Sequence, residues 1–198
     1  MTISEDGGKT FRQLLGYVGF DGVHPDHHAL WINPANPNQV ILGTDGGVYV
    51  SHNKGNNWRM VGSLPVSQFY HVSHDDQWPY HVYGGLQDNG SWEGPSRAPG
   101  GIQAKHWNSI GMGDGFWSYV DKTDSNVIYS EYQGGKLLRL DRTVGEVKNI
   151  PPVARGNEED LRFNWNTPLL VSAAKPGTIY YGSQYVHVST DQGESWKT

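Results

Sequence analysis

Short apolar runs separated by turn residues dominate the chain, most clearly over residues 28–64. Asn-Pro, Asp-Gly-Gly and Asn-Lys-Gly turns cut this stretch into four runs of four residues each, at 29–32, 40–43, 48–51 and 58–61. Short β-rich runs bounded by Gly, Pro, Asn and Asp predict strands joined by tight turns. The stretch therefore predicts a four-stranded antiparallel meander. One meander buries too little surface to be stable alone, so we expect further copies to pack against it.

An eight-residue pattern, Ser-x-Asp-x-Gly-x-Thr-aromatic, recurs with small changes at residues 4–11, 51–58 and 189–196. We call these segments the Ser-x-Asp turns. The Asp or Asn is expected to cap backbone N–H groups, the Gly to supply a positive φ, and the aromatic to anchor the next strand. The first two turns start 47 residues apart and the last two 138 apart, which is three intervals of 46. This period is in the range of β-propeller blades.

The same marks divide the whole chain into repeats. A strand followed by a polar turn, a second strand and a Gly-rich turn recurs after the first meander. The predicted units are a partial blade at 2–18, blades at 28–64, 68–110 and 114–151, and an incomplete blade at 166–198, with an inter-blade insertion at 152–165. The predicted fold is all-β, a propeller arc of about four antiparallel four-stranded blades.

Composition agrees with this picture and excludes several classes of protein. The 26 Gly, 8 Trp and 11 Tyr suit tight turns and flat sheet packing. A net charge of −5 argues against nucleic acid as a partner. The absence of Cys excludes disulfides and thiol chemistry. No apolar run approaches the ~18 residues of a membrane span, and no signal peptide is visible. Because the chain starts directly on a repeat motif, we expect it to be part of a longer protein.

Several strings are more specific than the turns alone, namely residues 27–34, 45–51, 84–91 and 164–168. With the Ser-x-Asp turns, they resemble a large bacterial family of Asp-box (BNR) repeat proteins called glycosyl hydrolase-like. That family is related in fold to the sortilin ectodomain and to xyloglucanase-type hydrolases with paired seven-bladed propellers. The resemblance covers essentially the whole chain. It implies a fragment of a seven-bladed propeller, with the remaining blades elsewhere in a longer chain, and a secreted or periplasmic location.

Propeller topology predicts where ligand-binding side chains lie. Loops that enter each blade and loops between second and third strands share one face, which we call the rim, and the Ser-x-Asp turns lie on the other face. The rim collects amides, carboxylates, His and aromatics, a mixture that suits sugar hydroxyls and C–H surfaces. The candidate substrate-binding residues are His27, His28, Asp45, Tyr70, Gln87, Asn89, Glu131, Gln133, Trp165 and Asn166.

Asp88 and Asp114 are the candidate catalytic pair, since each lies in a Gly-rich turn expected at the rim. Glycoside hydrolysis needs two carboxylates about 5–9 Å apart. The alternative is that each Asp caps its own turn, as expected for Asp45 in the equivalent loop.

A sialidase needs clustered arginines to bind the carboxylate of its substrate. Of the seven Arg, only Arg155 and Arg162 are expected near the rim, so this activity is disfavoured.

The segment His24-Pro25-Asp26-His27-His28 offers three imidazoles and a carboxylate within five residues. Such groups can bind metal ions. However, the spacing is not that of a zinc motif, and adjacent strand residues point to opposite faces. The sequence therefore predicts no metal site and no cofactor, with metal binding by these four residues left open.

Three functions remain for such a module. The first is a glycosyl hydrolase-like module that binds carbohydrate at the channel mouth, with hydrolysis by Asp88 and Asp114. The second is a non-catalytic propeller that binds a peptide or protein, as in the sortilin type. The third is a structural repeat scaffold. Because a shared fold does not fix an activity, these have to be separated by the site.

Overall fold

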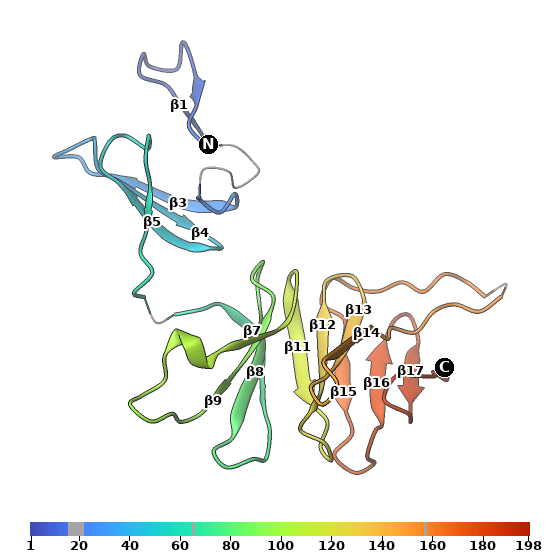
Figure 1. Cartoon of the computed structure of the whole chain (residues 1–198). Coiled ribbons are helices and arrows are strands. Elements are labelled where there is room, and N and C mark those ends of the chain that lie inside the picture. Colours follow the sequence, from blue (N-terminus) through green and yellow to red (C-terminus); the bar gives the residue numbers. More distant parts are fainter. Residues whose placement is uncertain (16–21, 65, 157) are drawn as a thin grey trace. The chain divides into compact units, whose positions relative to one another are not determined.

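The computed structural model describes residues 1–15, 22–64, 66–156 and 158–198 (Figure 1). The chain forms two compact units, Met1–Val66 and Ser67–Thr198, and each is described by itself. The described residues are all-β apart from one short 3₁₀ helix, η1 (Ala104–His106). They also contain no helix that is long and apolar enough to span a membrane.

The first unit contains one four-stranded antiparallel sheet and a small ribbon. The strands of the sheet follow in chain order as β3 (His27–Ile32), β4 (Val40–Thr44), β5 (Gly47–Ser51) and β6 (Arg59–Met60). This is the meander predicted from residues 28–64. Its core consists of Leu15, Val23, Leu42 and Tyr49, with Trp58 packed against them.

The ribbon pairs β1 (Thr2–Ile3) with β2 (Arg12–Gln13). The predicted partial blade at 2–18 is thus a two-stranded element where it is described, and its residues 16–18 lie outside the described part. The turn between the strands has the predicted caps, because Oδ1 of Asp6 accepts the N–H groups of Lys9 and Thr10 at 3.0 and 2.9 Å. The prediction that Phe11 anchors a core is wrong, since its side chain is 66% exposed.

The second unit contains three consecutive sheets (Figure 1). The first has β7 (Phe69–His74), β8 (His81–Leu86), β9 (Ser91–Pro95) and β10 (Asn108–Gly111). The second has β11 (Gly115–Val120), β12 (Val127–Tyr132), β13 (Lys136–Asp141) and β14 (Glu146–Asn149). The third has β15 (Leu169–Val171), β16 (Ile179–Gly182) and β17 (Val186–Ser189), and Lys197 forms a bridge with Val188. The prediction of antiparallel four-stranded propeller blades is confirmed.

An equivalent backbone hydrogen bond fixes the register between the first two strands of each of the four larger sheets. The N–H donor and carbonyl acceptor of this bond lie six residues apart in each case: Asn33 to Gln39, Asp75 to His81, Asp121 to Val127, and Ser172 to Thr178. Each bond closes the turn between the first and second strands. The four sheets can therefore be aligned residue by residue from this bond onward.

Apolar side chains fill the space between neighbouring sheets of the second unit. Tyr83 of the first sheet packs with Val120 and Ile128 of the second. Tyr129 on the other face of the second sheet packs with Ile179 of the third. Since side chains alternate along a strand, β12 contributes to both interfaces. The sheets therefore stack as blades do, each burying the faces of its neighbours.

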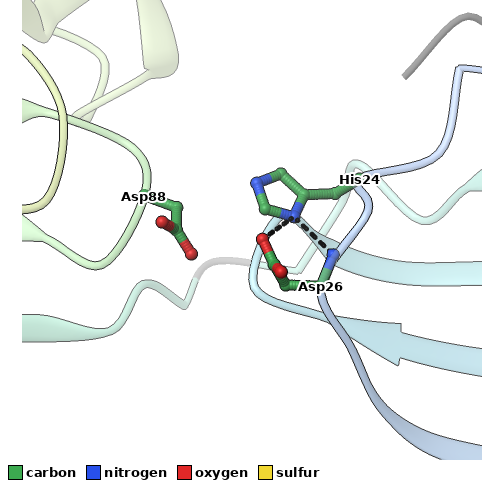
Figure 2. Close-up of side chains that lie close together, drawn as sticks. All are labelled: His24, Asp26 and Asp88. Atoms are coloured by element: carbon green, nitrogen blue, oxygen red, sulfur yellow. Dashed lines mark hydrogen bonds and ion pairs between the residues drawn. The ribbon is translucent and has the colours of Figure 1, made fainter. Parts of the chain in front are cut away.

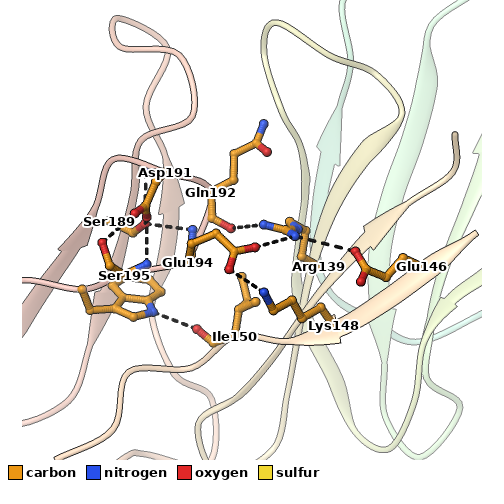
Figure 3. A network of polar contacts seen from close by, with 11 residues as sticks. Arg139, Glu146, Lys148, Ile150, Ser189, Asp191, Gln192, Glu194 and Ser195 are labelled. Carbon is orange, nitrogen blue, oxygen red and sulfur yellow. Dashed lines mark hydrogen bonds and ion pairs between the residues drawn. The ribbon is translucent and has the colours of Figure 1, made fainter. Parts of the chain in front are cut away.

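The Ser-x-Asp turn at 189–196 packs on the preceding sheet (Figure 3). Inside the turn, Ser189 Oγ accepts the N–H of Gly193 at 2.8 Å and Asp191 Oδ1 accepts that of Ser195 at 2.9 Å. Hydrogen bonds from the Ser195 hydroxyl, the Ser195 N–H and the Ser189 hydroxyl lower the pKa of Asp191 to about 2. The predicted cap is confirmed here. Trp196 also acts as the predicted anchor, because its Nε1–H donates to the carbonyl of Ile150 at 2.8 Å.

An ionic network joins the same turn to β13 and β14 (Figure 3). Arg139 donates to the carbonyl of Gln192 at 3.0 Å and lies 2.9 Å from the carboxylate of Glu194. Lys148 pairs with the same carboxylate. Glu194 is largely exposed, so these pairs orient the turn more than they stabilise it. The turn belongs to the blade interface, which supports the structural role predicted for its Asp.

Candidate functional site

The two candidate catalytic carboxyl groups belong to loops that touch each other in the second unit. The backbone N–H of Asp88, in the β8–β9 turn, donates to Oδ1 of Asp114 at 2.7 Å. Asp114 precedes β11 in the next blade and is only 8% exposed. The prediction that each Asp caps its own turn is therefore wrong for Asp114, which caps the turn of the neighbouring blade. Asp88 has φ of 55° and is exposed.

Glutamines in the loops between second and third strands hold the blade-entry segments. Oε1 of Gln133 accepts the N–H of Asp114 at 2.7 Å, and Oε1 of Gln184 accepts that of Arg162 at 2.8 Å. In the blade before them, Gln87 accepts the hydroxyl of Tyr70 at 3.0 Å. These contacts confirm that the two kinds of loop meet at one face. They also show that Gln133 acts within the scaffold.

The first strands of the three blades bring an aromatic cluster together. The imidazole of His71 on β7 stacks on the indole of Trp117 on β11, with ring centroids 3.5 Å apart and planes 9° apart. Nδ2 of Asn166, just before β15, lies 2.9 Å from Nε2 of His71. The amide nitrogen can only donate, so Nε2 of His71 accepts in this arrangement, as a neutral imidazole does. In agreement, burial lowers the pKa of His71. Three blades thus meet at one imidazole.

The more exposed candidates surround this cluster at the starts of the first strands. Trp165 is 61% exposed and is held by its carbonyl, which accepts the N–H of Gly134 at 3.1 Å. Tyr70 is 38% exposed and packs on Phe116 with ring centroids 4.5 Å apart. Asn89 is also exposed and donates to the carbonyl of Gln87 at 2.8 Å. Aromatic faces and amide groups therefore share this end of the blades.

Glu131 departs from the sequence prediction. The residue was expected at the rim, but it is fully buried, with 0% exposure. Its Oε1 accepts the N–H of Thr167 at 3.1 Å. Burial raises the pKa of Glu131 to about 8, although the N–H groups of Thr167 and Trp117 favour its charged form. A ligand at the rim therefore cannot contact this carboxyl group without a rearrangement.

The histidine-rich segment of the first unit forms separate pairs. Nδ1 of His24 lies 3.7 Å from the carboxylate of Asp26 (Figure 2). His28 is bonded to Asp45, with 2.8 Å between Nε2 and Oδ1. Burial lowers the pKa of His27. Within the described residues of this unit, no three of these groups converge on one point. Asp88, also drawn in Figure 2, belongs to the second unit and is described above with it.

Sequence reasoning missed two members of the aromatic cluster, namely His71 and Trp117. Neither His71 nor Trp117 is among the candidate residues chosen from the sequence. In the structure, His71 lies on β7 and Trp117 on β11, the first strands of their blades. In contrast, Arg155 donates to the carbonyl of Trp196, beside a Ser-x-Asp turn, so its expected position near the rim is wrong.

Replacement of Asp114 tests its structural role. Asp114→Ala removes the acceptor for the Asp88 N–H and is expected to cost about 1–3 kcal/mol of unfolding free energy. Asp114→Asn keeps an acceptor oxygen, so its cost should stay below about 1 kcal/mol. Urea unfolding of both variants measures this difference. Equal losses for Ala and Asn would show that the capping bond contributes nothing.

Comparison with known proteins relates the fold to solved structures at low sequence identity. The GH74 xyloglucanase from Xanthomonas campestris aligns with 17% identity over 87% of this chain and 30% of its own, with a TM-score of 0.46. YCF48 bound to D1 peptide aligns with 12% identity over 99% and 59%, with a TM-score of 0.45. The extracellular domain of a protein designated a one component system from B. thetaiotaomicron aligns with 16% identity over 96% and 24%, with a TM-score of 0.46.

This chain thus spans less than two thirds of the length of each of these proteins. No protein-family model matches the sequence, and no curated protein sequence does.

Proposed function

We propose that this chain is part of a β-propeller that binds carbohydrate at the rim of its second unit. The observation that supports the proposal is the group of exposed aromatic faces and amides at the starts of β7 and β15. Trp165 and Tyr70 offer flat apolar surfaces, and Asn166, Gln87 and Asn89 offer polar groups beside them. Sugars present both C–H faces and hydroxyl groups, so they match such a surface.

The proposal is for binding, with hydrolysis left as an outcome to be tested. A hydrolase needs one carboxyl group as an acid and another as a base or nucleophile. Asp114 is nearly buried and engaged by the Asp88 N–H, and Glu131 is fully buried. Asp88 alone is exposed among the carboxylates of the predicted rim in this unit. By the family resemblance, further blades of a longer chain and a secreted or periplasmic setting belong to the same proposal.

The affinity of a Trp165 variant for a glycan tests this function. Neutral oligosaccharides are first screened on an array with the 198-residue chain, and the best is titrated calorimetrically. Trp165→Ala is expected to weaken binding roughly tenfold, since loss of one stacking face costs about 1 kcal/mol or slightly more. Its stability should change by less than about 0.5 kcal/mol, because the side chain is largely exposed.

Trp78→Ala provides the matched control. Trp78 is 80% exposed in the turn between β7 and β8, at the opposite ends of these strands. Its removal should leave glycan affinity unchanged. Equal losses in both variants, or no binding of any glycan by the unmodified chain, would contradict the proposal. Released reducing sugar that disappears in Asp88→Asn would extend it to hydrolysis, and binding of extended peptides alone would favour the sortilin-like alternative.

A further inference from the structure

Glu131 occupies a position where the other three blades have glycine. The turn-closing bond between first and second strands aligns the sheets, and its carbonyl acceptors are Gln39, His81, Val127 and Thr178. Four residues beyond these acceptors stand Gly43, Gly85, Glu131 and Gly182. In β8, a Cβ at Gly85 would lie 2.0 Å from the backbone of Gly115 in the next blade. At Gly85 the interface with the next blade leaves no room for a side chain. At the equivalent position of the next blade, the interface contains the carboxyl group of Glu131.

The carboxyl group is sealed between β12 and the third sheet. One oxygen, Oε1, accepts the N–H of Thr167, which is itself fully buried. The other, Oε2, has no hydrogen-bond partner within the described part of the chain. Tyr181 on β16 is 1% exposed, and its hydroxyl interacts with the Glu131 carboxyl group and with the side chain of Thr167. A neutral carboxyl could donate to such a hydroxyl, whereas a charged one would have no counter-ion.

The backbone segment that is hydrogen-bonded to Glu131 also contains a residue of the rim site. Thr167 directly follows Asn166, whose amide contacts His71. Trp117, which stacks on the same imidazole, has its own N–H directed to the Glu131 carboxyl group. Asn166 and Trp117 come from different blades, and the Glu131 carboxyl group contacts the backbone beside Asn166 and that of Trp117. A change in the ionisation of this carboxyl group can therefore move both residues that contact His71.

We propose that Glu131 is a positioning residue of the rim site, and that its ionisation at alkaline pH loosens the 165–167 segment and releases bound ligand. The ligand part of this inference rests on the proposed carbohydrate-binding function. Both forms of the carboxyl group can accept the Thr167 N–H, but only the neutral form is buried without the cost of an unpaired charge. In the ionised form an unpaired charge is buried between two blades, which is costly, and water entry beside Thr167 relieves that cost.

The surrounding titratable groups do not change charge in the same range. Tyr181 of β16, Tyr119 of β11 and Tyr129 of β12 have raised pKa values because of burial, so they stay neutral well above pH 8. His71 of β7 faces the group through Asn166, and its lowered pKa keeps it neutral at pH 7. Burial raises the pKa of Glu131 to about 8, which places its transition between pH 7 and 9.

Hydrogen exchange of the Thr167 amide tests the positioning role without any ligand. After correction for the intrinsic exchange rate, protection of this amide in the unmodified chain should fall about tenfold between pH 7 and pH 9, by linkage to the ionisation. Glu131→Gln keeps an acceptor oxygen and cannot ionise, so its protection should not change with pH. Tyr181→Phe keeps the carboxyl and should retain the alkaline loss. An identical pH profile in the unmodified chain and Glu131→Gln would overturn the inference, as would loss of the pH dependence in Tyr181→Phe.

Glycan titration at the same pH values completes the test. Affinity should fall about tenfold from pH 7 to pH 9 in the unmodified chain and stay constant in Glu131→Gln, if ligand binding needs the ordered segment. Equal losses of affinity in both would overturn the link to the ligand. Absence of glycan binding at every pH, combined with the predicted exchange pattern, would refute the proposed function while leaving the positioning role supported.

Discussion

Gly85→Ala is expected to lower the free energy of unfolding of the second unit by about 3 kcal/mol or more. A Cβ at this position would lie 2.0 Å from the carbonyl carbon of Gly115 and 2.3 Å from the backbone nitrogen of Phe116. Both atoms belong to the first strand of the next blade, so no side-chain rotation can make room. The two sheets would have to separate and expose their shared core. Urea-unfolding curves give the size of the loss.

Gly182→Ala is the matched control, because Gly182 has the equivalent place in β16. There a Cβ would meet only the ring of Pro168, at 3.0 Å. Its expected cost is about 1 kcal/mol, which a small shift of the ring can absorb. If Gly85→Ala proved as stable as Gly182→Ala, the close packing of the first two sheets of this unit would be refuted.

The stability of the unmodified chain is expected to fall as the pH rises from about 4.5 to about 8. The ordinary pKa of a glutamate is 4.5, whereas burial raises that of Glu131 to about 8. Between these values the unfolded chain has released the proton and the folded chain still holds it. The folded state therefore binds more protons, and the free energy of unfolding falls by roughly 1 kcal/mol per pH unit. The contribution is complete below pH 4.5 and lost above pH 8.

Glu131→Gln should remove this slope. The two chains should have similar stability near pH 5, and the variant should be more stable by several kcal/mol near pH 8.5. Chemical unfolding at a series of pH values measures both curves. Glu146→Gln is the control, because Glu146 lies in an exposed part of β14 and should leave the slope unchanged. A slope that persists in Glu131→Gln would mean that another group binds the proton.

Local sequence patterns predicted the strands and turns because local chemistry fixes them. Turn residues around residues 28–64 define one meander, and β3 to β6 follow it. The caps of the Ser-x-Asp turns depend on residues within eight positions, so Asp6 and Asp191 were predicted correctly. Phe11 was not, because anchoring requires a neighbouring core. The sequence pattern shows that an aromatic residue follows the turn, but it does not show whether other residues form a core around that side chain.

The candidate site was predicted only in part because its contacts join different blades. Asp88 and Asp114 do lie on touching loops, yet the sequence could not show that one side chain caps the backbone of the other. Glu131 was assigned to the rim from its place beside a Gly-rich turn. Alignment of the four second strands shows Gly at the three equivalent positions, and this was the available sign of a buried interface. The contact between His71 and Asn166 spans 95 residues, beyond the reach of any local pattern.

The indole N–H signals of the eight tryptophans offer the most direct test of the proposed rim site. Each signal can be assigned by a single Trp→Phe replacement, and a two-dimensional nitrogen–proton spectrum is then recorded during titration with the best neutral glycan. Binding at the rim should shift the signals of Trp165 and Trp117 with one common affinity and leave that of Trp78 in place. Shifts at Trp78 with none at Trp165 and Trp117 would contradict a carbohydrate site at the starts of the first strands.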